Sequence, residues 1–189
     1  ESAALLTHAG IGTATIDGLV ETGEWDGAAS TSFFLLETST GDMVPATLYT
    51  MNDASNLYVA LVIERGDANF SEIATLYLDY NNSTTLDDGD DALRLSRTFS
   101  ASSAQFVTRF VDSYGAFCNG EQCEQQLPDV EDGGTNDGAG AVVNNGISVV
   151  FEWVHPLNSP DTRHDAPLAV GKKVQLRGDI SLLGTPIDE

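Results

Sequence analysis

Short runs of β-branched and aromatic residues, separated by clusters of glycine, asparagine and aspartate, extend along almost the whole chain. This pattern is typical of strands joined by turns, and no stretch of helical period is long enough for a major helix. Two runs, Leu57–Ile63 and Val149–Val154, are almost continuously apolar, as in central strands that are covered on both faces. The sequence therefore predicts an all-β protein, a β-sandwich or jelly roll of about nine or more antiparallel strands.

The length of 189 residues suits one domain. We expect a single sandwich domain over residues 13–189, preceded by an N-terminal arm or edge strand over residues 1–12. The strands are expected at Thr13–Ile16, Ser32–Glu37, Ala46–Met51, Leu57–Glu64, Ile73–Asp79, Ala92–Thr98, Gln105–Val111, Ile147–Val154 and Val174–Leu183.

The chain is strongly acidic, with 29 Asp and Glu residues, 8 Lys and Arg residues and a formal net charge of −21. We expect no binding to nucleic acid, because the phosphate backbone is attracted by Lys and Arg. No run of about 18 apolar residues is present, so we expect no membrane span. The acidity itself fits a solvated surface, adaptation to high salt, or carboxylates that are neutralised by bound metal.

Several features indicate a protein that is secreted or exposed at the cell surface. Cys118 and Cys123 have a spacing that could close a small disulfide loop in an oxidising compartment. The start at Glu1, without Met, is interpreted as a mature N-terminus left after removal of a leader. Three positions match the N-glycosylation sequon, namely Asn69, Asn81 and Asn82.

The densest group of carboxylates lies between two expected strands. Ca²⁺ binds six to eight oxygens from carboxylates, amides and backbone carbonyls, and a loop can supply them. Gly89 would permit the turn between the acidic residues. The alternative is a solvated acidic turn. The candidate Ca²⁺ ligands are Asp79, Asn81, Asp87, Asp88, Asp90 and Asp91.

A second polar group, Asp161, His164 and Asp165, could form another cation site or an ion-pair cluster. A His beside an Asp also fits a catalytic site, but no Gly-x-Ser-x-Gly nucleophile motif lies nearby. We therefore predict no catalytic residues and expect that the protein is not an enzyme. Glu152, which lies inside an apolar strand, needs a buried partner, and Asp17 and Glu152 could contribute to either cation site.

Four blocks of sequence follow one another along the chain. They are Ile16–Gly18 with Glu24–Trp25, Ala46–Tyr49 with Asn56–Val62, Ala74–Asp79 running into Asp87–Leu95, and Gly146–Trp153 followed by His155–Leu157. In this order they resemble the family 9 carbohydrate-binding modules and the wider DOMON-like sandwich group. The resemblance implies a β-sandwich, an acidic loop between two strands and a strand that carries an inward glutamate.

Sugar binding in that family depends on two tryptophans that hold a sugar ring between them. Phe70 stands in the stretch that corresponds to one of them, and no tryptophan follows Trp153, so the pair is not matched. Trp25 and Trp153 are instead expected in the core. A sugar platform could be rebuilt from other aromatic residues, for which the candidates are Phe70, Tyr80 and Tyr114.

The C-terminal strand that the resemblance implies is short or absent, which would leave an open sheet edge. The N-terminal arm of one subunit could complete the sheet of the next by strand addition, and such a head-to-tail contact makes filaments. We therefore expect a non-catalytic, calcium-stabilised structural subunit that self-assembles into an extracellular filament or surface homopolymer. The alternative is a carbohydrate-binding module that contacts glycans.

Overall fold

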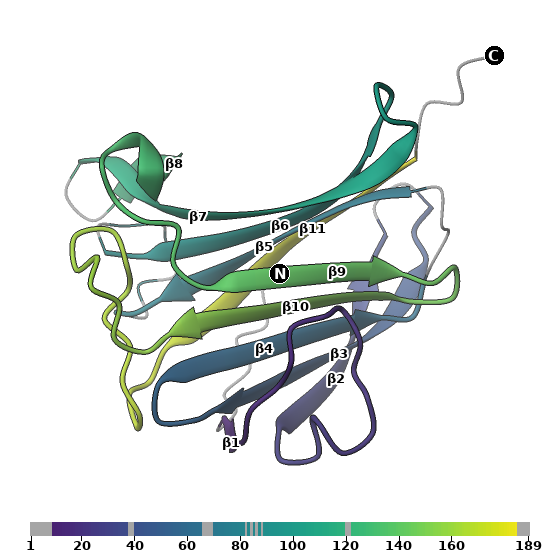
Figure 1. The fold of residues 1–189 in the computed structure, drawn as a ribbon, viewed down its shortest axis with the longest axis horizontal. Helices are drawn as coiled ribbons and strands as arrows, with labels where there is room; N and C mark the ends of the chain where they lie inside the picture. Colours follow the sequence, from purple (N-terminus) through teal and green to yellow (C-terminus); the bar gives the residue numbers. More distant parts are fainter. Residues whose placement is uncertain are drawn as a thin grey trace.

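The computed structural model describes residues 9–37, 40–65, 70–81, 83, 85, 87, 89–119 and 122–184. Two β-sheets pack against each other as a sandwich, which confirms the predicted all-β class (Figure 1). Neighbouring strands are antiparallel with one exception, the pair of the first and third strands. A short 3-10 helix, η1 (Asp129–Glu131), follows the eighth strand.

The strands of the first sheet, called sheet 1, are β1 (Gly10–Ile11), β2 (Ala29–Leu36), β3 (Met43–Asn52), β4 (Asn56–Ile63), β9 (Ala139–Asn144) and β10 (Val149–Pro156). Their spatial order is β1–β3–β4–β10–β9, and β2 also pairs with β3. The strands of sheet 2 are β5 (Phe70–Asp79), β6 (Asp91–Ser100), β7 (Gln105–Asn119), β8 (Gln122–Pro128) and β11 (Gln175–Gly184). Their spatial order is β11–β5–β6–β7–β8.

Eight of the nine expected strands are present close to the predicted ranges. The expected strand Thr13–Ile16 is wrong, because residues 12–28 form an irregular segment that pairs with no strand. Its alternation of apolar residues is real, but Ala14 and Ile16 use it to pack on the outer face of sheet 1. The sequence reasoning also missed β8, which is mostly polar, and β9, in which Val142 and Val143 are the β-branched residues.

The main core lies between the two sheets and is built from alternate residues of each strand. Val59, Leu61 and Ile63 of β4 face Leu93 and Leu95 of β6 across it. On the same side, the rings of Phe151 and Trp153 stack with centroids 5.7 Å apart. Each large apolar side chain that is fully buried in this way contributes about 1.5–3 kcal/mol to stability.

A second, smaller core covers the outer face of sheet 1. The irregular segment 12–28 lies across β3, β4 and β10 (Figure 1) and buries Trp25 against Met51 and Tyr58. Trp25 and Trp153 are 4% and 2% exposed, so both expected core positions are confirmed.

Glu152 of β10 holds this segment in place. It is fully buried, and its Oε1 accepts a hydrogen bond from Trp25 Nε1 at 3.1 Å. Its Oε2 accepts from the backbone N–H groups of Asp17 and Gly18 at 3.0 and 2.7 Å. The predicted need for a buried partner is thus met by three donors from segment 12–28, and these contacts occupy both carboxylate oxygens.

The described part of the expected N-terminal arm is residues 9–12. Gly10 and Ile11 form β1, which runs parallel to the end of β3, opposite Met51 and Asn52. Gly10 lies so close to the backbone of Gly27 that a Cβ would come within 1.9 Å of its carbonyl oxygen. The backbone of β1 is therefore held at the sheet edge, while the side chain of Ile11 is 84% exposed. Residues 1–8 of the predicted arm lie outside the described residues.

Candidate metal centre

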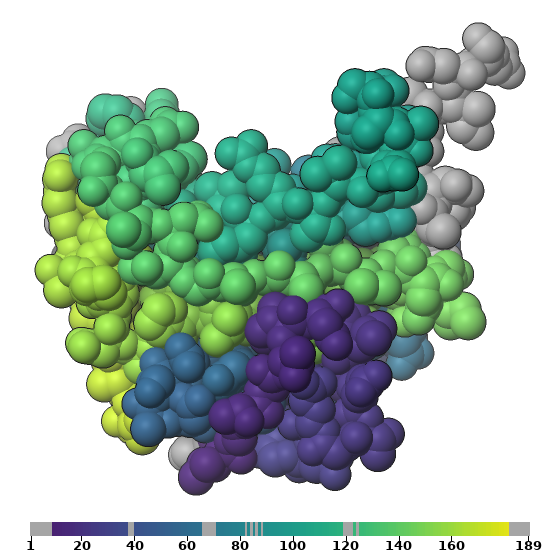
Figure 2. Space-filling model, viewed as in Figure 1, coloured from purple at the N-terminus to yellow at the C-terminus, as the bar shows by residue number. Residues whose placement is uncertain are grey.

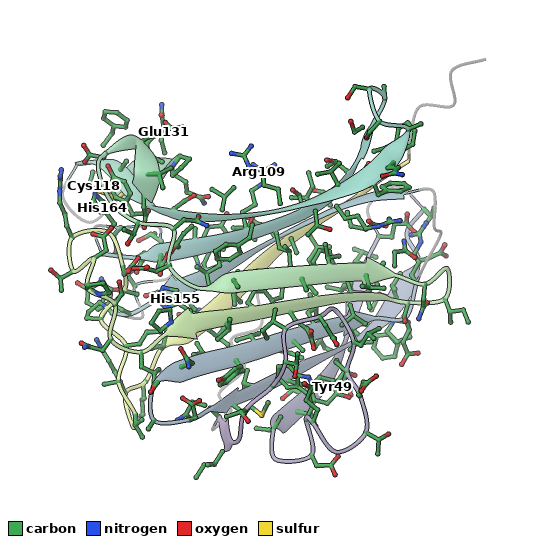
Figure 3. The ribbon with its side chains drawn as sticks, viewed as in Figure 1. Tyr49, Arg109, Cys118, Glu131, His155 and His164 are labelled. Carbon is green, nitrogen blue, oxygen red and sulfur yellow. A yellow bond between two sulfur atoms is a disulfide. The ribbon has the colours of Figure 1, made fainter. Side chains whose placement is uncertain are left out.

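Four buried polar side chains meet at one end of the sandwich, between the two sheets. They are Asp91, Asp112, His155 and Asp165, and we call them the buried cluster. Each offers one ligand atom, and these atoms all lie within 4.8 Å of one another. None of the four residues is more than 5% exposed. Figure 3 shows His155 at the end of β10, pointing into the space between the sheets.

Strand alternation brings three of these side chains to the core. Asp91 begins β6 on the same face as Leu93, and His155 follows Trp153 by two residues in β10. Asp112 likewise follows Phe110 by two residues in β7. Because alternate residues of a strand point to the same side, all three polar groups continue rows of core residues. Asp165 comes from the loop after β10.

Most oxygen atoms of the buried cluster lack hydrogen-bond partners among the described residues. The buried atoms without such a partner are both oxygens of Asp91, both oxygens of Asp165 and one oxygen of Asp112. His155 Nε2 lies 3.1 Å from Asp91 Oδ2, but neither atom makes a well-aligned hydrogen bond. A buried carboxylate without compensation costs several kcal/mol, so this group of charges needs protons or a cation.

A fifth carboxylate, Asp129 of η1, borders the cluster. It is fully buried, and neither of its carboxylate oxygens has a hydrogen-bond partner in the described part of the chain. Burial raises its pKa to about 8, and the negative charges of Asp91 and Asp165 act in the same direction. Four carboxylates therefore share one interior region with a single imidazole.

The pKa values of the cluster carboxyls are shifted upward by the same causes. Burial and the charges of Asp91 and Asp129 raise the pKa of Asp112 to about 11. Burial and the charge of Asp91 raise the pKa of Asp165 to about 6. Burial lowers the pKa of His155, but the close approach and charge of Asp91 outweigh it and raise the pKa overall. A divalent cation would remove the need for these protons.

The glycine-rich stretch 131–140 is held against the cluster. The N–H of Asp112 donates to Asn136 Oδ1 at 2.6 Å, and the N–H of Asp137 donates to Asp112 Oδ2 at 2.9 Å. Gly134 leaves room for the neighbouring side chains, because a Cβ there would lie 2.3 Å from Asp161 Oδ2. These contacts hold the stretch 131–140 against the buried cluster through its side chains and its backbone.

Of the predicted loop ligands, the structure brings Asp91 into the buried cluster. The other predicted ligands that the structure describes make their hydrogen bonds mainly within the loop. Asp79 Oδ1 accepts from Ser83 N–H at 3.1 Å, and Asn81 Nδ2 donates to Asp87 Oδ2 at 3.1 Å. Both oxygens of Asp90 accept backbone N–H groups, at 3.3 and 3.1 Å.

Burial acts against the charge of two carboxyl groups of the loop, those of Asp87 and Asp90. Asp87 Oδ1 is buried and has no hydrogen-bond partner among the described residues. Burial and the neighbouring Asp87 raise the pKa of Asp90 to about 7. Asp88 lies outside the described residues. A Ca²⁺ site made by the loop itself stays a prediction.

The second predicted group, Asp161, His164 and Asp165, divides in two. Asp165 belongs to the buried cluster. Asp161 Oδ1 lies 2.7 Å from His164 Nδ1, and its Oδ2 accepts from Thr135 N–H at 2.8 Å. Asp161 and His164 therefore form an ion-pair cluster that fastens the stretch 131–140.

The structure describes the side chains of two of the three residues of the expected sugar platform, Tyr80 and Tyr114, and the platform stays a prediction. Tyr80 packs against the main core, with Lys172 Nζ 5.0 Å from its ring centre. Tyr114 donates its hydroxyl to Asp132 Oδ2 at 3.1 Å and meets the edge of the His164 ring. The side chain of Phe70 lies outside the described residues.

The predicted disulfide is confirmed. Cys118 and Cys123 are bonded across β7 and β8, where they are directly paired. Among the sequon positions, Asn81 is exposed on the surface, whereas Asn69 and Asn82 lie outside the described residues. Glycosylation stays a prediction at all three.

Sequence reasoning missed Asp112, Asp129 and His155. A usable signal existed for two of them, since Asp112 and His155 occupy core-facing positions of strands that were predicted correctly. Chemically, the completed cluster offers three carboxylates and one imidazole, a donor set suited to a divalent metal ion.

No family model matches the chain, and no curated protein is significantly similar to it. Within the described ranges, no helix is long and apolar enough to cross a membrane. The protein is an all-β sandwich with a buried cluster that could hold a metal ion.

Proposed function

We propose that the protein is a non-catalytic, extracellular β-sandwich that is stabilised by Ca²⁺ and serves as a structural subunit of a filament or surface assembly. The observation that carries the proposal is the set of buried carboxylate oxygens of Asp91, Asp112 and Asp165 that accept no hydrogen bond from the described residues. A bound cation would compensate their charge and join β6, β7 and the loop after β10. The cation is thus assigned a structural role.

Ca²⁺ is proposed because carboxylate oxygens predominate and because extracellular modules bind this ion even weakly. Asp91, Asp112 and Asp165 would be its ligands, with Asp129 close by. His155 would then support Asp91 through its ring nitrogen and would not bind the ion, since Ca²⁺ takes oxygen ligands. The disulfide supports the extracellular location, because such bonds persist in oxidising compartments.

Thermal unfolding with and without Ca²⁺ tests the stabilisation. At a free Ca²⁺ concentration of about 100 times Kd, binding adds about 2.7 kcal/mol, or roughly 5–10 °C in Tm for a chain of this size. Asp112→Asn should lose this gain, whereas Glu131→Gln, at an exposed position beside the site, should keep it. Equal Tm values of the wild-type protein in Ca²⁺ and in chelator would refute the proposal.

The assembly role is supported by the sheet edge at β1. Among the described residues of the arm, Gly10 and Ile11 pair with β3 there, and Ile11 exposes an apolar side chain at the edge. Residues 1–12 of one subunit could add to the sheet of another. Removing residues 1–12 should abolish polymers seen by electron microscopy. Normal polymers from the truncated protein would argue against strand addition.

Carbohydrate binding is the second candidate, and one surface favours it. A pocket of about 310 Å³ is lined by Tyr114, Phe117 and Arg163, among others. Phe117 is 64% exposed and has a φ of 56°, an uncommon backbone state for a bulky residue. Exposed aromatic rings beside hydrogen-bonding groups suit sugar rings.

A glycan array tests this second candidate. Phe117→Ala should remove binding, while Phe99→Ala, at an exposed aromatic residue elsewhere, should keep it. An array on which the wild-type protein binds no glycan in the presence of Ca²⁺ would exclude a sugar-binding role.

A further inference from the structure

The basic residues are distributed very unevenly over the fold. The first 64 residues contain nine acidic residues and no Lys or Arg, and Arg65 is the first basic residue of the chain. The strands β9 and β10 contain none either. No described strand of sheet 1 therefore carries a Lys or Arg side chain. The 8 Lys and Arg residues are confined to sheet 2 and to the loops.

Three of these residues lie on the outer face of sheet 2. Arg94 alternates with the core residues Leu93 and Leu95, Arg109 precedes the core residue Phe110, and Arg177 follows the core residue Leu176. We call them the arginine face.

Two of the three strands of the arginine face, β6 and β7, are adjacent, and β5 lies between β6 and β11. β6 and β7 are paired so that Ser96 lies opposite Arg109 and Arg94 opposite Val111. Arg94 and Arg109 are thus diagonal neighbours on one sheet surface.

The arginine face is exposed. Arg94 and Arg109 are exposed, and neither makes an ion pair within the part of the chain that the structure describes. Figure 3 shows Arg109 pointing away from the sandwich above the middle of β7. In Figure 2 the surface is hollowed there, between the tip of the β6–β7 hairpin and the segment around η1. Arg177 stacks over the ring of Tyr77 at 5.2 Å.

The opposite side of the sandwich is acidic. Segment 12–28, which covers the outer face of sheet 1, carries Asp17, Glu21, Glu24 and Asp26, and we call these four residues the acidic segment. Asp17, Glu21 and Asp26 are exposed. The molecule therefore presents acidic residues over the outer face of sheet 1, and three arginines together with the exposed Asp179 on the outer face of sheet 2.

We propose that the arginine face of one copy binds the acidic segment of the next copy. The inference rests on the assembly role proposed above and names the surfaces that carry it. Because the two surfaces lie on opposite sides of the molecule, the contact is head-to-tail and does not close, so copies add in a row. Complementary charges orient the encounter and exclude the arrangement in which two acidic faces meet.

Charge exchange tests the proposal on the full chain in Ca²⁺. The variant Arg94→Glu/Arg109→Glu should stay monomeric in sedimentation velocity at concentrations where the wild-type protein polymerises. The variant Asp17→Lys/Glu21→Lys should do the same. A mixture of the two should form polymers again, because each acidic face then meets a basic segment and each acidic segment meets a basic face.

Two controls separate a specific contact from a general effect of charge. Lys172→Glu/Lys173→Glu changes the net charge by the same amount as Arg94→Glu/Arg109→Glu, but in a loop, and should still polymerise. Each variant should unfold at nearly the wild-type temperature, which shows that its monomer is folded. Wild-type polymers should also dissociate toward about 1 M salt, where the Debye length is about 3 Å.

The outcomes distinguish this inference from the proposed function. If Arg94→Glu/Arg109→Glu forms polymers like those of the wild type, the arginine face does not carry the contact between copies. That result would leave the proposal of assembly through the N-terminal arm intact. A monomeric wild-type protein would overturn both. A monomeric wild-type protein that is retained on a polyuronate column, and released by the Arg94→Glu/Arg109→Glu change, would assign the face to an anionic polysaccharide instead.

Discussion

Glu152 is the residue that ties two distant parts of the chain together. Its carboxylate accepts three hydrogen bonds, all from segment 12–28, in a site that excludes water. Burial raises its pKa, while the bonds from Gly18, Asp17 and Trp25 act in the opposite direction and favour the charged form. Trp25 is therefore positioned by a charge as well as by packing.

Glu152→Ala should lower the free energy of unfolding by roughly 3 kcal/mol, because it leaves buried donors without an acceptor. Urea unfolding followed by tryptophan fluorescence measures the loss. Glu64→Ala, at an exposed acidic residue just after β4 in the same sheet, should change stability by less than about 0.5 kcal/mol. Similar stabilities of the two variants would show that segment 12–28 is held by packing alone.

Substitution of His155 distinguishes the classes of metal ion that the buried cluster could bind. If the ion is Ca²⁺, His155→Gln should leave Ca²⁺ binding within about tenfold of the wild type, since imidazole is not a usual Ca²⁺ ligand. If the ion is Zn²⁺ or Mn²⁺, the imidazole is a ligand and its loss removes binding. Isothermal titration of metal-free protein with each ion makes the comparison. Tight binding of Zn²⁺ but not Ca²⁺ by the wild-type protein would contradict the calcium assignment.

The sequence predicted Asp91 and Asp165 as possible ligands but in two separate sites. Their meeting depends on the pairing of β6 with β7 and on the path of the loop after β10, which no local pattern encodes. Asp112 and His155 were detectable in principle, because each continues a row of core residues in its strand. Asp129 has no such signal, since it lies in η1, and its burial results from tertiary packing.

At the level of elements, the hairpin of β7 and β8 depends on its disulfide. β8 is polar and pairs only with β7, at the edge of sheet 2. A cross-link that closes a loop of this length removes about 2 kcal/mol of unfolded-state entropy in the chain-entropy model.

Cys118→Ser/Cys123→Ser should therefore lower the free energy of unfolding by roughly 2 kcal/mol. Hydrogen exchange should increase most in β8 and in the adjoining half of β7. The rest of sheet 2 serves as the internal reference, because β5 and β6 are flanked by strands on both sides. Equal protection of β8 in the two proteins would show that strand pairing suffices without the bond.

Strands with apolar alternation or continuous apolar runs were predicted within a few residues, as in Leu57–Ile63, where both faces are covered. The elements that sequence reasoning missed are those whose stability comes from neighbours. β9 consists of small residues, and Gly140 fits against Phe110 where a larger residue would crowd it. Segment 12–28 has the alternation of a strand but is fixed by Glu152, which lies more than a hundred residues further along the chain.

For the whole molecule, the pKa values predict an unusual response to pH. Burial raises the pKa of Asp90 to about 7 and that of Asp165 to about 6, from an ordinary value of 3.8. A raised pKa in the folded state means that folding is favoured by protons. The stabilising contribution is complete below about pH 4 and is lost as the pH rises through about 6 to 7. The pKa of His155 is also raised, so its contribution has the same sign.

Metal-free protein should therefore be more stable near pH 5 than near pH 8, contrary to the common acid lability of proteins. The gain in Tm on adding Ca²⁺ should rise over the same interval, because the ion requires deprotonated carboxylates. Calorimetry of protein stripped on a chelating resin, at several pH values with and without Ca²⁺, measures both trends. A metal-free protein whose Tm rises from pH 5 to pH 8 would contradict the shifted pKa values.

The pairing of β5 with β11 delays the folding of the chain during its synthesis. β5 ends at Asp79, and the strand that completes its other side begins at Gln175. A ribosome that adds about 5–20 residues per second needs on the order of 5–20 s to make the intervening 100 or so residues. The completion of sheet 1 is delayed in the same way, since β4 pairs with β10. Neither sheet can therefore be completed before these later strands have been made, and the nascent protein spends that time with apolar strand edges exposed, as a client for chaperones.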